Sequence, residues 1–160
     1  MNFQISALSE RLFSHFYGAT EEQLRKAGAQ RVIADSEPGF PCRISMRDAK
    51  IGESLILLNF THLDENTPYC ASHAIFVIEG AKEQTFPKNT VPEVLRSRLL
   101  SLRAFDENYC MIAAEVCAGA DLEQTITKIA ADPGVAFLHV HNAAPGCYAA
   151  RIDLLDNEET

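Results

Sequence analysis

The chain has 160 residues, of which 47% are hydrophobic and 22% are charged, and its net charge is −8. These values are typical of one globular domain and exclude a disordered, collagenous or coiled-coil chain. The excess of acidic side chains argues against nucleic-acid partners, which need a basic face. No apolar run approaches the roughly 20 residues of a membrane-spanning helix, so we expect no membrane partner.

The N-terminus lacks the basic segment and long apolar run of a secretion signal, so we expect a cytoplasmic protein. The cysteines are odd in number, widely spaced and without a CxxC pair, which excludes a disulfide framework or zinc knuckle and predicts that most of them are small buried thiols. They are Cys42, Cys70, Cys110, Cys117 and Cys147.

The first thirty residues predict two short helices. Ser9 fits the N-cap of the first helix, and Gly18 fits its end. Thr20 and Gln23 have the spacing of a capping box, which predicts a second helix that ends at Gly28.

The rest of the chain is predicted to be rich in strands. A helix is expected from Val91 to Arg98, and another from Asp121, with Gln124 as its capping-box partner, to the turn at Asp132. Strands are expected over residues 31–35, 42–45, 54–62, 73–79, 100–105, 109–117, 135–142 and 147–154.

Hairpins outnumber crossovers in this pattern, which predicts an α+β fold. We expect a single domain over residues 1–154, with a mostly antiparallel sheet, two N-terminal helices and one or two inserted helices. An acidic C-terminal tail is expected over residues 155–160.

The predicted strand 135–142 contains the pair His139 and His141. Side chains alternate along a strand, so both imidazoles point to one face, about 7 Å apart. They are able to converge on one ligand or metal ion. The structural alternative is two histidines near a sheet edge, each hydrogen-bonded to a carbonyl or to water.

The next turn, at residues 143–146, places further polar groups beside this pair. A four-residue loop sets His141 opposite Tyr148 and His139 opposite Ala150. Whatever the register, one hairpin brings together His139, His141, Asn142, Cys147, Tyr148 and Arg151.

Three other positions are candidates for chemistry. His73 begins a predicted strand, and a capped strand start is its structural alternative. Arg43 follows Cys42, whose alternatives are a nucleophilic thiol and an inert buried one. Arg103 lies in an apolar setting and needs an anionic partner, which is either Asp106 or a substrate.

Several blocks of the sequence resemble a known bacterial family, the domain of unknown function 1203. The blocks are PGFPCR at 38–43, SHAIFV at 72–77, LLSLRAFD at 99–106, HVHNA at 139–143 and GCYAAR at 146–151. The resemblance runs almost from end to end. It implies a small, single-domain, soluble bacterial protein, and it implies no activity and no functional residue.

Our first hypothesis is an enzyme or binding protein for a small anionic molecule. Histidine moves a proton near neutral pH, and arginine holds a carboxylate or phosphate. The sequence leaves open whether the protein is an enzyme, and it indicates no cofactor. The candidate catalytic residues are His73, His139, His141, Cys147 and Tyr148, and the candidate ligand-binding residues are Arg43, Arg103, Asn142 and Arg151.

Two alternatives remain. The first is a zinc site with His139 and His141 as ligands, completed by His73, Cys42, Cys147 or a carboxylate. The second is a non-catalytic interaction or structural module, with a sheet edge near residues 42–45 that is able to pair with a partner or with a second copy in a homodimer.

Overall fold

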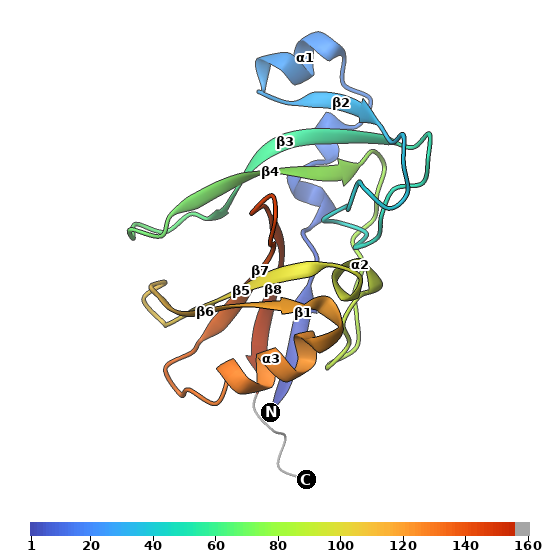
Figure 1. The fold of residues 1–160 in the computed structure, drawn as a ribbon. Coiled ribbons are helices and arrows are strands. Elements are labelled where there is room, and N and C mark those ends of the chain that lie inside the picture. Colours follow the sequence, from blue (N-terminus) through green and yellow to red (C-terminus); the bar gives the residue numbers. More distant parts are fainter. Residues whose placement is uncertain (156–160) are drawn as a thin grey trace.

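Eight strands within residues 1–155 form two antiparallel sheets, as the computed structural model shows (Figure 1). These are the residues that the structure describes, so all but the first residue of the expected tail at 155–160 lies outside them. The prediction of an α+β fold with a mostly antiparallel sheet is confirmed. Among the described residues, no helix is both long and apolar enough to cross a membrane.

The larger sheet has five strands in the spatial order β1-β8-β7-β5-β6. Helix α3 (Leu122–Ile129) contributes Leu122 and Ile126 to the apolar core on this sheet. The strands are β1 (Asn2–Ser6), β5 (Leu99–Phe105), β6 (Met111–Ala118), β7 (Phe137–Asn142) and β8 (Tyr148–Leu155).

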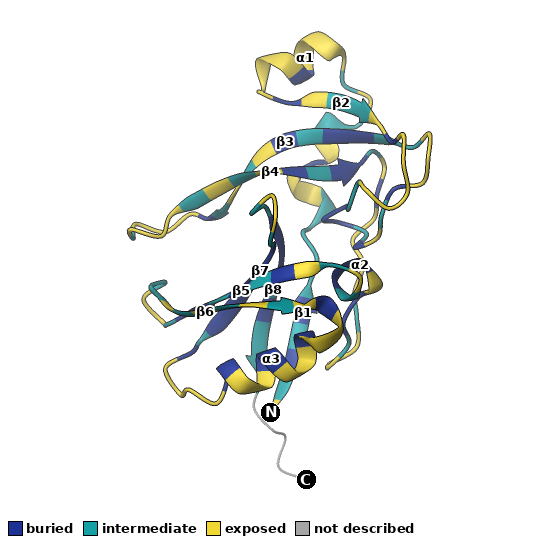
Figure 2. Cartoon of the chain, in the orientation of Figure 1, coloured by how far each residue is buried: buried dark blue, intermediate teal, exposed yellow. Residues whose placement is uncertain are grey.

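The smaller sheet has three strands in the order β2-β3-β4 and its own apolar core. They are β2 (Gln30–Ile33), β3 (Ser54–Leu63) and β4 (Ala71–Ile78). The β7–β8 hairpin of the larger sheet reaches toward this sheet in Figure 1. Strand β7 is buried along its whole length (Figure 2), so its polar side chains lie inside the protein.

The N-terminal region differs from its prediction in part. The capping box is confirmed, because Thr20 and Gln23 exchange hydrogen bonds at the start of α1 (Glu21–Lys26). The first predicted helix is wrong. Ser9 makes no side-chain cap, and Phe13 leaves the helical conformation, so residues 10–16 form two short 3-10 turns. Strand β1, which precedes them, was not predicted.

The middle of the chain contains two more corrections. Residues 42–45 form no strand, because Cys42 makes only an isolated bridge, to Phe76. Helix α3 exists, but Asp121 does not cap it with its side chain. The helix before residue 99 is confirmed as α2 (Glu93–Arg96), and β5 and β6 form the predicted hairpin.

The predicted register of the hairpin between β7 and β8 is confirmed at one end only. His141 lies opposite Tyr148, as expected. His139 lies opposite Arg151 instead of Ala150, because the register shifts between Val140 and His141. Such a bulge adds one residue to one strand and displaces every later pair.

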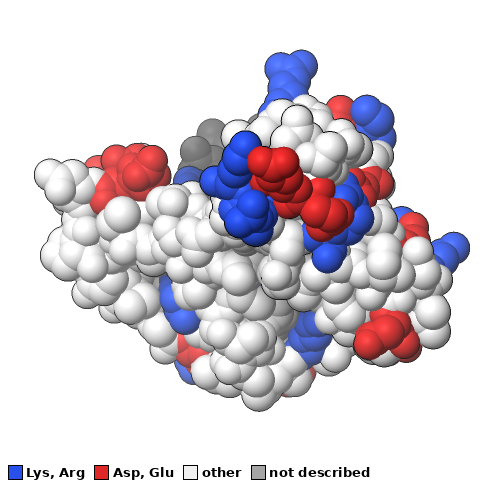
Figure 3. All heavy atoms as spheres, turned by 90° about the horizontal axis from the view of Figure 1, so that it is seen from above, with Lys and Arg blue, Asp and Glu red and all other residues white. Residues whose placement is uncertain are grey.

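The surface charge is mixed on the face seen in Figure 3. Basic and acidic side chains lie next to each other in small groups, and uncharged surface separates these groups. Ion pairs of the protein include Arg31 with Glu79 and Arg47 with Glu53.

Candidate functional site

Four histidines meet where the two sheets face each other. His139 and His141 come from β7, and the smaller sheet supplies His62 from β3 and His73 from β4. The ring centroids of His73 and His141 are 5.2 Å apart, and that of His62 lies 4.9 Å from each of them. The cluster therefore joins strands that are distant in sequence.

Strand geometry explains how each imidazole reaches the cluster. Alternation along β7 places His139 and His141 on one face, with Phe137 beside His139. His62 lies within the irregularity of β3 between Thr61 and Leu63. We did not predict His62, although a histidine at the polar end of a buried strand is the same pattern that indicated His73.

The hydrogen bonds fix the state of His141. Its Nδ1 lies 2.9 Å from the carbonyl oxygen of Gly146. A carbonyl only accepts hydrogen bonds, so Nδ1 is the protonated nitrogen of the neutral ring. The Nε2 atom then carries a free lone pair. It is buried and has no hydrogen-bond partner among residues 1–155.

The other imidazoles contact one another. Nε2 of His62 lies 2.9 Å from Nδ1 of His73, and Nδ1 of His62 lies 3.3 Å from Nδ1 of His139. Burial lowers the pKa of His62 to about 4 and that of His139 to about 3. The pKa of His141 is also lowered to about 3, mainly by burial. These rings are therefore neutral at pH 7.

Tyr148 closes the cluster from β8. Its ring stacks on His62 at a centroid distance of 5.1 Å and meets the ring of His139 edge-on at the same distance. Burial raises the pKa of the Tyr148 phenol well above its usual range. The phenol is therefore protonated at neutral pH and is able to donate a hydrogen bond.

Arg103 places a positive charge beside the cluster. It lies opposite His139 on β5, and its charge contributes to the lowered pKa of all four histidines. It forms no hydrogen bond or ion pair within the described part of the chain, so the predicted pairing with Asp106 is wrong. The Asp106 carboxylate instead accepts the backbone N–H groups of Asn108 and Cys110.

Arg151 is occupied elsewhere. Its Nε donates to the Asp153 carboxylate at 2.7 Å, and its guanidinium lies 3.9 Å from the centre of the Phe137 ring. An arginine with both a carboxylate and an aromatic partner is satisfied without a ligand.

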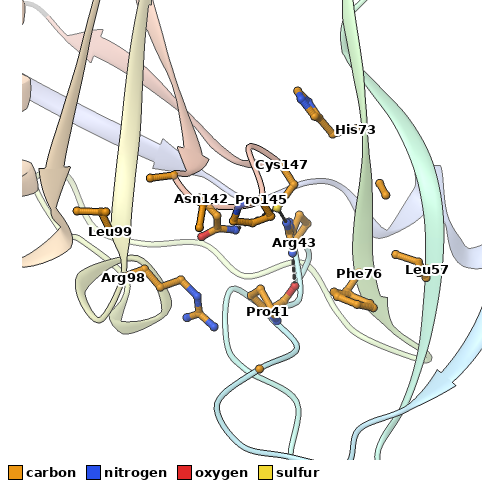
Figure 4. Close-up of a pocket in the computed structure, with 14 residues that line it drawn as sticks. Pro41, Arg43, Leu57, His73, Phe76, Arg98, Leu99, Asn142, Pro145 and Cys147 are labelled. Carbon is orange, nitrogen blue, oxygen red and sulfur yellow. Dashed lines mark hydrogen bonds between the residues drawn. The ribbon is translucent and has the colours of Figure 1, made fainter.

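A cavity of about 630 Å³ lies next to the cluster (Figure 4). His73 lines it and belongs to the cluster as well, so the two features are continuous. The cavity brings together residues from both sheets and from the loops between them. Among its lining residues are Pro41, Arg43, Phe76, Asn142, Pro145 and Cys147.

Arg43 is the least exposed cation of the cavity wall, at 2%. Its Nε donates to the carbonyl of Tyr148 at 2.8 Å, its Nη1 to the carbonyl of Pro41 at 2.5 Å and its Nη2 to Sγ of Cys147 at 3.1 Å. No carboxylate among residues 1–155 pairs with it. Burial lowers the pKa of Arg43, which reflects the free-energy cost of its charge.

The polar residues near Arg43 differ in whether their hydrogen bonds and charges have partners. Nδ2 of Asn142 lies 3.4 Å from Sγ of Cys147, while Oδ1 of Asn142 is buried and has no partner within residues 1–155. Arg98 also lines the cavity, but its charge is balanced by Asp48 at 2.5 Å. Arg43 is thus the wall's unbalanced charge.

Cys42, by contrast, lies in the apolar core of the smaller sheet, and it is the one buried cysteine of the five, so the prediction that most of them are buried is wrong. It is 1% exposed, and its sulfur accepts the backbone N–H of Ile78 at 3.2 Å. It lines no part of the main cavity, which favours the prediction of an inert buried thiol.

The predicted residues thus fall into three groups. The cluster contains His73, His139, His141, Tyr148 and the nearby Arg103; the cavity wall contains Arg43, Asn142 and Cys147; Arg151 is held apart by Asp153.

Residues 39–153 match a family described as a protein of unknown function, DUF1203. The chain belongs to this family. The matched range contains every residue of the cluster and of the cavity wall named above. No curated protein and no solved structure matches the chain. DUF1203 membership therefore assigns no reaction, and the function has to be argued from the site.

Proposed function

We propose that the protein binds a small organic anion in the cavity between the two sheets, with Arg43 as its principal contact. The observation that supports this most is that Arg43 is 2% exposed and has no carboxylate partner among the described residues. A buried cation without a counter-ion costs several kcal/mol of folding free energy. A bound anion offsets that cost.

The guanidinium has donors left for such a ligand. Its three hydrogen bonds use one N–H on each nitrogen, whereas Nη1 and Nη2 each carry a second N–H. Arginine binds a carboxylate or phosphate through paired N–H groups, more strongly than it binds neutral acceptors. The acceptors present here are two carbonyls and a thiol.

The remaining wall narrows the chemistry of the ligand. Leu57, Phe76 and Pro145 present apolar surface to the cavity, which suits a ligand with a hydrocarbon part better than an inorganic ion. Oδ1 of Asn142 lacks a donor, so the ligand is expected to carry an N–H or O–H group as well. The cavity volume of about 630 Å³ lies within the range of known small-molecule sites.

An enzyme is the second candidate. The observation that favours it is that His73 and Cys147, which carry a neutral imidazole and a thiol, both line the cavity where the anion is proposed to bind. These side chains are suited to proton transfer and nucleophilic attack. Turnover of a bound anion that is lost in both His73→Ala and Cys147→Ala would distinguish this candidate from simple binding.

The binding proposal is tested by a thermal-shift screen of small organic acids, each paired with its neutral amide, in buffer with EDTA. We expect an acid to raise the unfolding free energy by about 2.7 kcal/mol at a hundred times its Kd, and its amide to have no effect. Arg43→Met is expected to abolish the shift.

The matched control is Arg47→Met, because Arg47 is paired with Glu53 and does not line the cavity. It is expected to respond to the acid as the wild type does. Equal shifts by acid and amide, or an unchanged response of Arg43→Met, would contradict the proposal.

A further inference from the structure

One imidazole nitrogen each from His62, His73 and His141 lie together at a spacing close to that of metal ligands. No two of the three atoms are more than 4.8 Å apart. Zinc binds imidazole nitrogen at about 2.0–2.1 Å, so two imidazoles on one tetrahedral zinc place their nitrogens about 3.3 Å apart. The pair His62 and His73 is already at 2.9 Å. The widest pair therefore has to close by about 1.5 Å at most.

His141 shows the arrangement most specific to a metal ligand. Its Nδ1–H donates to the Gly146 carbonyl, which directs the bare lone pair of Nε2 into the cluster. Histidines that bind metals almost always donate their other N–H to a carbonyl or carboxylate in this way. A buried lone pair without a partner is otherwise a cost of about 1–3 kcal/mol.

His139 contacts His62 at the ring nitrogen of His62 that does not face His73. When Nε2 of His62 binds a metal, the proton of that ring resides on Nδ1, which faces Nδ1 of His139 at 3.3 Å. His139 is then the acceptor that orients His62, and it is a positioning residue instead of a ligand.

We propose that His62, His73 and His141 bind one divalent transition metal ion of the imidazole-preferring class, with zinc as the best match, at the junction of the two sheets. The site differs from the zinc alternative in the sequence analysis, because His62 replaces His139 as a ligand. This inference is independent of the anion proposal, since it depends on other atoms.

The charges around the site determine its fourth ligand. The cluster contributes three neutral nitrogens, no carboxylate within the described part of the chain joins them, and Arg103 adds a positive charge nearby. Arg103 weakens the binding of a cation, but it also attracts an anion to the metal. Three protein ligands with an open position are typical of catalytic zinc, so the fourth ligand is a hydroxide, a carboxylate or a phosphate oxygen.

Two of the ligands come from β3 and β4 of the smaller sheet, and the third comes from β7 of the larger sheet. A metal bound to all three would link the sheets directly. Because the unfolded chain does not hold these histidines together, metal binding adds to the stability of the fold.

The experiment is equilibrium dialysis of untagged protein, first stripped with EDTA, against zinc in a non-coordinating buffer, followed by elemental analysis. We expect about one zinc per chain in the wild type. His62→Ala and His141→Ala are expected to lose it. His15→Ala is the matched control, because His15 is the exposed histidine outside the cluster, and it is expected to keep the zinc.

Two results would overturn the proposal: no zinc bound by the wild type, or full zinc binding by a folded His141→Ala variant. If that variant fails to fold, the absorption spectrum of cobalt-substituted wild type decides. Bands of four-coordinate cobalt without a thiolate charge-transfer band support the site, and a thiolate band overturns it. Arg43→Met is expected to keep its zinc, so failure of the anion proposal leaves this outcome unaffected.

Discussion

Nδ1 of His62 lies 3.3 Å from Nδ1 of His139, so the two sheets contact each other through a pair of imidazoles. Packed sheets normally meet through interdigitated apolar side chains. Here the polar contact is extended by His73 and His141, and no carboxylate of residues 1–155 joins the cluster to stabilise a positive charge. Local violations of good packing are expected at functional sites, where binding takes precedence over stability.

The first prediction concerns pH in the metal-free protein. The histidines of the cluster have a pKa of about 4 for His62 and about 3 for His139 and His141, against about 6.5 in the unfolded chain. As the pH falls below 6.5, the unfolded state takes up protons first, so stability is constant above about pH 7 and falls between about pH 6.5 and 3.

The measurement is the urea midpoint of EDTA-treated protein at a series of pH values. His139 and His141 each contribute a slope of up to about 1.4 kcal/mol per pH unit, and the less buried His62 contributes less, so a loss of about 2–3 kcal/mol per unit is expected in that window. Equal stability at about pH 7 and pH 5 would show that the rings take up protons without penalty.

The second prediction compares two fully buried residues of β7, Leu138 and His141, both 0% exposed. Leu138→Ala leaves an apolar cavity and is expected to cost about 3 kcal/mol. His141→Ala is expected to cost less in EDTA at about pH 7.5, because it also removes an unpaired buried nitrogen. Urea unfolding of both variants makes the comparison, and an equal or larger loss for His141→Ala would assign that residue a purely structural role.

The third prediction compares two arginines. Arg43→Met removes a buried charge that lacks a counter-ion, and it is expected to leave the unfolding free energy unchanged or higher. Arg31→Met breaks the ion pair with Glu79, whose pKa this partner lowers to about 2, and it is expected to lower the unfolding free energy. A larger loss in Arg43→Met than in Arg31→Met, measured without ligand, would be incompatible with a charge awaiting an anion.

The sequence was sufficient for features that depend on local geometry. Alternation placed His139 and His141 on one face, and the turn length placed His141 opposite Tyr148. The capping box at Thr20 was confirmed for the same reason, since both of its hydrogen bonds lie within one helical turn.

Features that depend on distant contacts were not predictable in this way. Strand β1 has only five residues, and it is stabilised by pairing with β8 near the other end of the chain. His62 reaches the cluster only because the two sheets face each other, which no local pattern encodes. Asp106 was one of two partners considered for Arg103, because it is close in sequence, but its carboxylate accepts hydrogen bonds from the backbone of its own turn.

The polar junction between the two sheets is the proposed binding centre for a metal ion. A crystal structure of the untagged protein grown with zinc, with anomalous data on both sides of the zinc absorption edge, tests it most directly. We expect one anomalous peak about 2.0–2.1 Å from one nitrogen atom each of His62, His73 and His141. A map without a peak there, with Nε2 of His141 still unpartnered or bound to water, would contradict it.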